Sequence, residues 1–481
     1  MIQGTASHAG KSVITTALCR WLARAGYRVA PFKAQNMSLN SAVTPDGGEI
    51  GRSQAFQAAA CGIPPETAMN PVLLKPMGGN RCQVVLKGKP YCIAEGRGDP
   101  DAPRRALEAA AECLASLRRR FDVVVIEGMG SPAEINLRGR ETANMPVAAL
   151  ADSPVLLVGD IERGGVFASL AGTLVLLEPE DRRRVRGLLI NKFSGDAEVL
   201  TPGTAELERR FGVPTLGVLP WLRDLHIDEE DAVSLTAAAP SDRGEIDIVV
   251  PRFPGISNFT DLHPLEREPG VRVRYVDTAG QWGNPELVVL PGSRTVATDL
   301  QWLRDRGLAE RVTAHAQAGR RVIGLCGGYQ MLGRAILDPH GIEGCESVPG
   351  LGLLDIETTF AVEKTLTRTS GICAVPGLED LPVEGYEIHH GITPTPGRRP
   401  ALRLGGRTDG TSSSDGRIFG CYLHGLFDHE SFRHGLLRQL GGSPATGVPV
   451  ASVFDRLADW LEASVDTRIV LDLILHSEPL R

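Results

Sequence analysis

The sequence predicts an α/β protein made of two successive domains, each built on a mainly parallel β-sheet. Short apolar segments alternate with helix-like stretches over the first 220 residues, as in sheets that are covered by helices on both faces. This alternation lapses over residues 235–245, where the sequence LTAAAPSDRGE is small, polar and rich in turn formers. It then resumes toward the C-terminus, which indicates a second α/β half of similar size.

Length and composition agree with this division and exclude several classes of protein. The 481 residues are enough for about two to four domains. The net charge of −7 argues against nucleic-acid or anionic-membrane partners, and no apolar run approaches the roughly 20 residues of a bilayer span. No secretory signal opens the chain, and nine scattered cysteines without CxxC spacing indicate a reducing compartment. We therefore expect a cytoplasmic protein.

The first domain is predicted to comprise residues 1–238. Ala-rich or amphipathic stretches between its apolar segments predict the crossover helices that parallel strands require. Strands are expected at 28–31, 123–126, 155–158, 187–190 and 215–218, with helices at 13–25 and 106–119.

The second domain is predicted to comprise residues 246–481, after a linker at 239–245. The linker assignment rests on the small, polar and Pro/Gly-punctuated sequence there. Strands are expected at 246–250, 271–275, 287–290 and 322–325.

The N-terminal segment GTASHAGKS predicts a phosphate-binding loop. It has one residue more between its glycines than the usual GxxxxGK[ST] motif, but it still leads into the start of the predicted helix 13–25. Backbone N–H groups and the helix dipole would then face an anion, and the Lys11 amine would reach the β- and γ-phosphates of ATP. Asn191 follows a predicted strand and is a candidate adenine contact, although Asn in this position is often a turn former. The predicted nucleotide-binding residues are Gly4, Thr5, Gly10, Lys11, Ser12 and Asn191.

A P-loop also needs a carboxylate near Mg²⁺, at the end of another strand. Glu127 directly follows the apolar strand 123–126 and precedes a glycine, which places it at the edge of the sheet where ligands bind. Asp160 has a similar but weaker setting. The predicted magnesium ligands are Ser12, Glu127, Asp46 and Glu49.

A nucleophile elbow is predicted in the second domain. The apolar segment 321–325 leads into Gly-x-Cys-x-Gly around Cys326 and then into a helix. This is the sulfur counterpart of the GxSxG motif, in which glycines permit the tight turn and the helix start stabilises a thiolate. A buried structural cysteine is the alternative, which the flanking glycines disfavour.

A thiolate nucleophile needs a base and an oxyanion hole. His424 follows a short apolar strand and precedes a glycine, so it is the predicted base, with His389 and His390 as weaker candidates. Backbone N–H groups at Gly292, which ends a predicted strand, and at Gly327 are the predicted oxyanion donors.

Nine segments of the sequence together resemble the cobyric acid synthase family, in the same order along the chain. They are QGTASHAGKS, PFKAQNMSLNS, DGGEIGRSQ, IEGMGSPAEINL, GDIERGGVFAS, INKFSGD, GLCGGYQMLG, GYEIHHG and YLHGLF. The resemblance implies a P-loop domain of the dethiobiotin-synthetase type, followed by a domain similar to class I glutamine amidotransferases.

The same resemblance implies ATP- and Mg²⁺-dependent amidation of a corrinoid. Glutamine would supply ammonia, and adenosylcobyrinic acid a,c-diamide would be amidated at its b, d, e and g carboxylates to give adenosylcobyric acid. The large acidic substrate calls for cationic and amide groups at its site. Candidates from the family-like segments are Gln35, Asn36, Asn40, Arg52, Lys75 and Arg163.

One position departs from the class I pattern. Those enzymes carry His-x-Glu, whereas Leu426 stands two residues after His424. Either a Cys–His dyad suffices, or Asp428 or Glu430 orients the imidazole. Three other functions compete with the main hypothesis: a cobyrinic acid a,c-diamide synthase, a non-synthetic P-loop switch, and a degenerate amidotransferase acting as a regulator.

Overall fold

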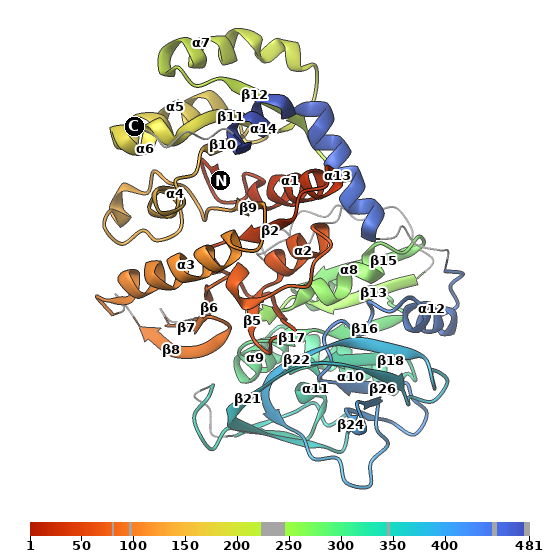
Figure 1. Ribbon diagram of the computed structural model, residues 1–481. Helices are drawn as coiled ribbons and strands as arrows, with labels where there is room; N and C mark the ends of the chain where they lie inside the picture. Colours follow the sequence, from red (N-terminus) through yellow and green to blue (C-terminus); the bar gives the residue numbers. More distant parts are fainter. Residues whose placement is uncertain (79–80, 96–98, 223–245, 344–346, 445–449, 476–481) are drawn as a thin grey trace. The chain divides into compact units, whose positions relative to one another are not determined.

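A computed structural model describes residues 1–78, 81–95, 99–222, 246–343, 347–444 and 450–475 (Figure 1). The chain divides into two compact units. The first unit consists of residues 1–38, 44–227 and 448–481, and the second of residues 39–43 and 228–447. The predicted linker 239–245 lies outside the described residues.

The first unit is built on parallel strands in the order β2-β9-β1-β10-β11-β12. A parallel bridge between Ile2 and Glu127 places β1 beside β9, and the remaining neighbours pair in parallel. The strands are β1 (Ile2–Gly4), β2 (Val29–Phe32), β9 (Val123–Ile126), β10 (Val155–Asp160), β11 (Val185–Phe193) and β12 (Thr215–Pro220). The five strands expected from the sequence here are confirmed to within a few residues.

Helices and a smaller sheet complete the first unit. The helices are α1 (Lys11–Arg24), α2 (Arg52–Ala60), α3 (Ala102–Arg118), α4 (Met145–Ala151), α5 (Val166–Leu176), α6 (Pro179–Arg184) and α7 (Thr201–Phe211). The smaller sheet has the order β3-β6-β7-β8, from β3 (Gln35–Met37), β6 (Val72–Gly78), β7 (Arg81–Leu86) and β8 (Lys89–Glu95); β5 is Glu49–Gly51.

The last two helices, α13 (Val450–Ser464) and α14 (Thr467–Leu475), belong to the first unit, whereas the predicted second domain 246–481 included them. Helix α13 packs on α1, where Leu457 and Leu461 are buried. Ion pairs join Arg20 to Asp455 at 2.7 Å and Arg24 to Asp459 at 2.6 Å. Helix α13 lies beside α1 (Figure 1), and burial of its apolar side chains against α1 explains why the chain end folds with the N-terminal helix.

The second unit is built on a six-stranded sheet of order β15-β13-β16-β18-β26-β25, parallel except for β25. Its strands are β13 (Ile246–Pro251), β15 (Val271–Val276), β16 (Leu287–Leu290), β18 (Arg321–Leu325), β25 (Thr411–Ser412) and β26 (Ile418–Cys421). Its helices are α8 (His263–Glu266), α9 (Val296–Asp305), α10 (Leu308–Gln317), α11 (Gly327–Leu332) and α12 (Glu430–Gln439). The four strands expected here are confirmed.

The second unit also carries a sheet that the sequence analysis did not foresee. The long strands β21 (Glu357–Cys373) and β22 (Pro382–Ile392) form an antiparallel pair, with β19 (Ala335–Leu337), β20 (Ser347–Pro349), β23 (Leu402–Leu404) and β24 (Arg407–Asp409) in the same sheet. The remaining short strands are β4 (Ser41–Val43), β14 (Ile256–Ser257) and β17 (Gly292–Ser293).

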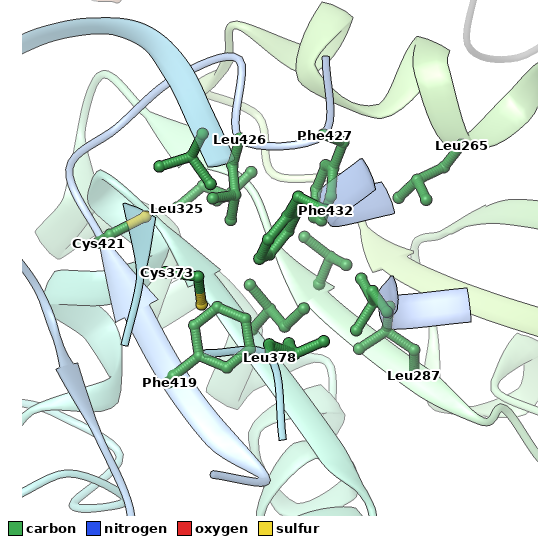
Figure 2. Packing of buried hydrophobic residues seen from close by; sticks show 14 of the residues in the cluster. Leu265, Leu287, Leu325, Cys373, Leu378, Phe419, Cys421, Leu426, Phe427 and Phe432 are labelled. Atoms are coloured by element: carbon green, nitrogen blue, oxygen red, sulfur yellow. The ribbon is translucent and has the colours of Figure 1, made fainter. Parts of the chain in front are cut away.

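Buried aliphatic and aromatic side chains hold the main sheet of the second unit in place. One cluster joins Leu287, Leu325 and Phe419 on the sheet to Phe427 and Phe432 (Figure 2). Burial of such side chains contributes roughly 1.5–3 kcal/mol each. In the part of the chain that the structure describes, no helix is long and apolar enough to cross a bilayer.

Candidate active site

The carboxyl ends of four neighbouring parallel strands, β13, β16, β18 and β26, carry the candidate glutaminase residues. Cys326 directly follows β18 and His424 follows β26, and these two strands pair in register. Parallel strands present their carboxyl ends at one edge of the sheet, so residues 98 positions apart converge there.

Cys326 occupies a strained turn. Its φ of 50° and ψ of −105° lie outside the regions favoured by non-glycine residues. The next two residues begin α11, and a Cβ added at Gly328 would lie 2.0 Å from the Leu290 carbonyl oxygen. A Cβ at Gly324 would lie 2.7 Å from the Gly328 carbonyl carbon. The glycines of the elbow are therefore required by close backbone packing.

His424 is held by a carboxylate that the sequence analysis missed. Its Nδ1 lies 2.7 Å from Asp261 Oδ2, and the Gly425 N–H donates to Asp261 Oδ1 at 3.0 Å. Asp261 lies in the short 3-10 helix Phe259–Leu262, downstream of β13. Burial lowers the pKa of His424, but the charges of Asp261 and Cys326 and hydrogen bonds to both outweigh it and raise the pKa to about 10.

Asp261 corrects the expectation for the third member of the triad. The sequence leaves open a Cys–His dyad or an imidazole oriented by Asp428 or Glu430, but the imidazole Nδ1 is bonded to Asp261. Glu430 lies on α12, 3.7 Å from His434 Nδ1. Asp261 stands in the segment SNFTD after the first strand of the domain, and no local pattern there pairs it with His424.

Cys326 contacts the same imidazole and strand β22. A hydrogen bond between Cys326 and His424 contributes to the shift described above. The Cys326 Sγ also lies 3.7 Å from the Ile388 carbonyl oxygen. Tyr386 stacks on the His424 ring, with centroids 5.4 Å apart, and the two residues exchange backbone hydrogen bonds. The His424 imidazole thus contacts the Cys326 thiol on one side and the Asp261 carboxylate on the other.

Gly292 and Gly327, the expected oxyanion donors, flank this constellation. A Cβ at Gly292 would lie 3.2 Å from His424 Cε1, and one at Gly327 would lie 2.7 Å from the Ser293 backbone nitrogen. The two segments therefore abut next to the histidine, where backbone N–H groups can face a developing oxyanion.

His389 and His390, the weaker candidates for the base, have other partners. His389 stacks on Tyr422 with centroids 3.7 Å apart, and its Nδ1 lies 2.8 Å from the Gly391 carbonyl oxygen. Burial lowers the pKa of His389 to about 3. His390 Nδ1 lies 3.1 Å from the Ala361 carbonyl oxygen.

The P-loop of the first unit connects β1 to α1. The Lys11 amine donates to the carbonyl oxygens of Ala6 and Gly130 at 2.9 and 3.0 Å. The Ser12 hydroxyl donates to Glu127 Oε1 at 2.8 Å, so the structure brings these two expected magnesium ligands together.

Glu127 is buried with two further partners that the sequence analysis did not single out. Lys33 Nζ lies 2.9 Å from its Oε1, and Gln57 Nε2 donates to its Oε2 at 2.5 Å. All three side chains are almost fully buried. The signal for Lys33 is a lysine directly after strand β2, in a chain with few lysines.

Asn191 supports the P-loop. Its side-chain amide donates to the Ala9 carbonyl oxygen at 3.0 Å, and a Cβ at Gly10 would lie 2.0 Å from Asn191 Nδ2. The adjacent Lys192 donates to the His8 carbonyl oxygen and to Asp160, both at 2.8 Å. These bonds support the shape of the loop, and the adenine contact of Asn191 stays a prediction.

Two expected magnesium ligands are engaged elsewhere. Glu49 forms a buried ion pair with Lys75, which was expected to bind the corrinoid. Asp46 accepts a hydrogen bond from the Thr67 hydroxyl at 2.8 Å. Within the described segments, no group of three or more His, Cys, Asp or Glu side chains is arranged to hold a metal ion.

The other residues expected at the corrinoid site differ in their surroundings. Gln35 accepts from the Thr142 hydroxyl at 2.8 Å, and Asn36 donates to Gln54 at 2.9 Å. Arg163 is exposed after β10 and Arg52 begins α2. Asn40 is buried and belongs to the second unit. Their role in corrinoid binding stays a prediction.

Comparison with known proteins identifies the family. A model described as the CobQ/CobB/MinD/ParA nucleotide binding domain matches residues 1–234, and one described as the CobB/CobQ-like glutamine amidotransferase domain matches residues 247–432. A cobyric acid synthase from Geobacillus thermodenitrificans is 49% identical over 98% of this chain and 97% of its own. Those from Yersinia enterocolitica and Sorangium cellulosum are 47% and 48% identical, covering 100% and 99% of this chain and 99% and 98% of theirs.

The chain belongs to the cobyric acid synthase family. As a member of this family it is a glutamine-hydrolysing amidating ligase of cobalamin biosynthesis, and the expected fold class and enzyme class are confirmed. The solved structure of PurLQS from Thermotoga maritima aligns with 40% of this chain and 99% of its own, at 19% identity and a TM-score of 0.32.

Proposed function

We propose that this protein amidates the b, d, e and g carboxylates of adenosylcobyrinic acid a,c-diamide, using glutamine and ATP. The observation that carries the proposal is the Cys326–His424–Asp261 series in one unit together with a P-loop and a buried Glu127 in the other. A carboxylate is inert toward ammonia, so one chain needs one site that liberates ammonia and another that activates the acceptor.

The glutaminase half-reaction follows from the positions of three side chains. The Cys326 thiol gives its proton to His424, and the thiolate attacks the glutamine amide carbon. Backbone N–H groups at Gly292 and Gly327 stabilise the tetrahedral oxyanion. The C–N bond breaks, the nitrogen takes the proton from His424 and leaves as ammonia, and water hydrolyses the remaining thioester to glutamate. Asp261 holds the ring and stabilises its cationic form throughout.

In the synthetase half-reaction, the P-loop binds the phosphates of ATP. An acceptor carboxylate attacks the γ-phosphorus of ATP, ADP leaves, and ammonia then displaces phosphate from the acyl phosphate. The Lys11 amine lies at the helix start, where it can pair with the phosphates. Gly4, Thr5 and Gly10 let the loop backbone approach them closely.

Mg²⁺ fits one pair of side chains here. The Ser12 hydroxyl and Glu127 carboxylate oxygens lie 2.8 Å apart, which suits neighbouring ligands of an ion that binds oxygen at about 2.0–2.1 Å. Ser12 and Glu127 would hold the ion, which would neutralise phosphate charge. Lys33 and Gln57 fix the carboxylate. Glu49 and Asp46 stay predicted ligands, and in the structure Lys75 and Thr67 engage them.

Incubation with glutamine, ATP and each corrinoid tests the proposal. Mass spectrometry should show four amides added to adenosylcobyrinic acid a,c-diamide, and Cys326→Ala should abolish this reaction with glutamine while free ammonia restores it. A product with only the a and c amides would assign the protein to the earlier amidation step. Equal glutamine-dependent rates in wild type and Cys326→Ala would remove the thiol from the mechanism.

A further inference from the structure

Residues Leu39–Val43 belong to the second unit, although the residues on both sides of them belong to the first. The segment includes β4 and meets several groups that support the glutaminase pair. Val43 packs in a small apolar cluster with Tyr386 and Ile388, and its carbonyl oxygen accepts from Arg368 at 3.5 Å. Tyr386 is the residue stacked on His424, and Ile388 supplies the carbonyl oxygen next to the Cys326 sulfur.

The segment Leu39–Val43 is also connected to the His424 ring, through the side chain of Asn258. The Ser41 backbone N–H donates to Asn258 Oδ1 at 3.0 Å, and Asn258 Nδ2 lies 3.1 Å from His424 Nε2. All of these groups are buried. Asn258 has a φ of 51°, a left-handed conformation that Asn tolerates better than most residues. Its side chain is therefore placed by a specific backbone turn.

The Ser41 contact fixes which way the Asn258 amide points. A backbone N–H needs an acceptor, so the amide oxygen faces Ser41 and the NH₂ group faces the imidazole. An NH₂ group can only donate, so His424 Nε2 must offer its lone pair, and the ring proton then resides on Nδ1 toward Asp261. This is the neutral form of the ring, and the bond uses the lone pair that the Cys326 proton must reach.

We propose that Asn258 is a positioning residue that disfavours protonation of His424 Nε2, and that the Ser41 N–H keeps it in this orientation. The inference rests on the proposed glutaminase. Release of the Ser41 contact lets the amide turn so that Oδ1 faces the ring, where it accepts from the Nε2–H of the cationic form. Along the chain, Leu39–Val43 continues on both sides into residues of the first unit.

The other groups around the His424 ring favour its cationic form or carry no charge. Asp261 and the Cys326 thiolate favour the cationic ring, and buried His389 and Tyr386 also face it from β22. Asn258 differs from them because it favours the neutral ring when its NH₂ group faces Nε2 and the cationic ring when its Oδ1 does. The proton moves only between Cys326 Sγ and His424 Nε2, so no other reactant is needed.

Asn258→Gly tests the inference with little backbone strain, because glycine accepts a positive φ. Without ATP or corrinoid, glutamate release should rise about fivefold, the effect of one ordinary hydrogen bond. Iodoacetamide modification of Cys326, followed by peptide mass spectrometry, should begin at lower pH than in wild type. Asn284→Gly, an exposed position before β16, is the matched control and should match wild type.

Ser41→Pro removes the donating N–H while leaving Asn258 in place. Like Asn258→Gly, it should raise glutamate release and let Cys326 modification begin at lower pH. A fall in glutamate release with an unchanged pH profile for Cys326 modification would overturn the inference and leave Asn258 with a packing role. Circular dichroism verifies that each variant folds. Cys326→Ala separates the two proposals: if it abolishes glutamate release while Asn258→Gly matches wild type, the glutaminase stands and the positioning role fails.

Discussion

His424 Nδ1 lies 2.7 Å from Asp261 Oδ2, and the two residues are 163 positions apart in the sequence. The carboxylate follows β13 and the imidazole follows β26, at the edge of the sheet where Cys326 follows β18. This chain therefore gains an orienting carboxylate from the start of its amidotransferase domain, although the position after His424-Gly425 is Leu426.

Asp261→Asn should lower the glutaminase rate by at least about tenfold, because an amide neither stabilises the cationic ring nor enforces its tautomer. Asp261 contributes to the raised pKa of His424, so its loss should lower that pKa. The His424 ring would then lose its proton at a lower pH than in wild type. The pH dependence of Cys326 modification by iodoacetamide measures this change. Glu430→Gln, on the exposed start of α12, is the control and should retain the rate. Equal loss in both variants would contradict the assignment.

Lys11→Ala should reduce corrinoid-dependent ATP hydrolysis by at least about a hundredfold, because the phosphates lose their cationic partner. Glutamate release from glutamine should remain measurable, since Cys326, His424 and Asp261 lie in the other unit. Lys89→Ala, at an exposed position on β8, controls for loss of one lysine. Loss of both activities in a folded Lys11 variant would contradict two separable sites.

Much of this site could be predicted from local sequence. The elbow around Cys326, the P-loop and the strand ending at Glu127 are short patterns whose residues are adjacent in the chain. Strand boundaries were also predictable, because buried parallel strands such as β9 are continuous apolar runs.

Contacts between distant segments could not be predicted in this way. Asp261 and Asn258 are defined by where the turn after β13 meets the end of β26, and no local pattern encodes that pairing. The strands β21 and β22 are half-exposed and carry charged residues, so their hydrophobic signal is weak. The return of α13 to the first unit depends on a match with the surface of α1, which composition does not reveal.

Lys33→Met should destabilise the first unit by about 3 kcal/mol, because Glu127 would lose its buried cationic partner. The double variant Lys33→Met/Glu127→Gln should recover most of that loss, since the uncompensated charge is then gone. Calorimetric unfolding of the full chain measures both. Additive losses in the double variant would show that the two side chains do not interact.

Gly328→Ala should lower stability by about 1–3 kcal/mol and abolish glutaminase activity, because the new methyl group would meet the Leu290 carbonyl oxygen 2.0 Å away. Relief of that overlap must move the start of α11, and Cys326 with it. Gly280→Ala is the matched control, as the nearest atom to its added methyl is 4.0 Å away. Full activity in Gly328→Ala would show that the elbow tolerates displacement.

Asp409 should make the second unit less stable as pH rises. Burial and the charge of Glu387 raise the pKa of Asp409 from 3.8 to about 7. A carboxyl whose pKa is higher in the folded state binds its proton more tightly there, so its stabilising effect is complete below about pH 4 and is lost as pH rises through 7. Asp409→Asn keeps an acceptor for the Tyr422 N–H but carries no charge. Its melting temperature relative to wild type should therefore increase between pH 5 and pH 8, whereas a pH-independent difference would contradict titration of this buried group.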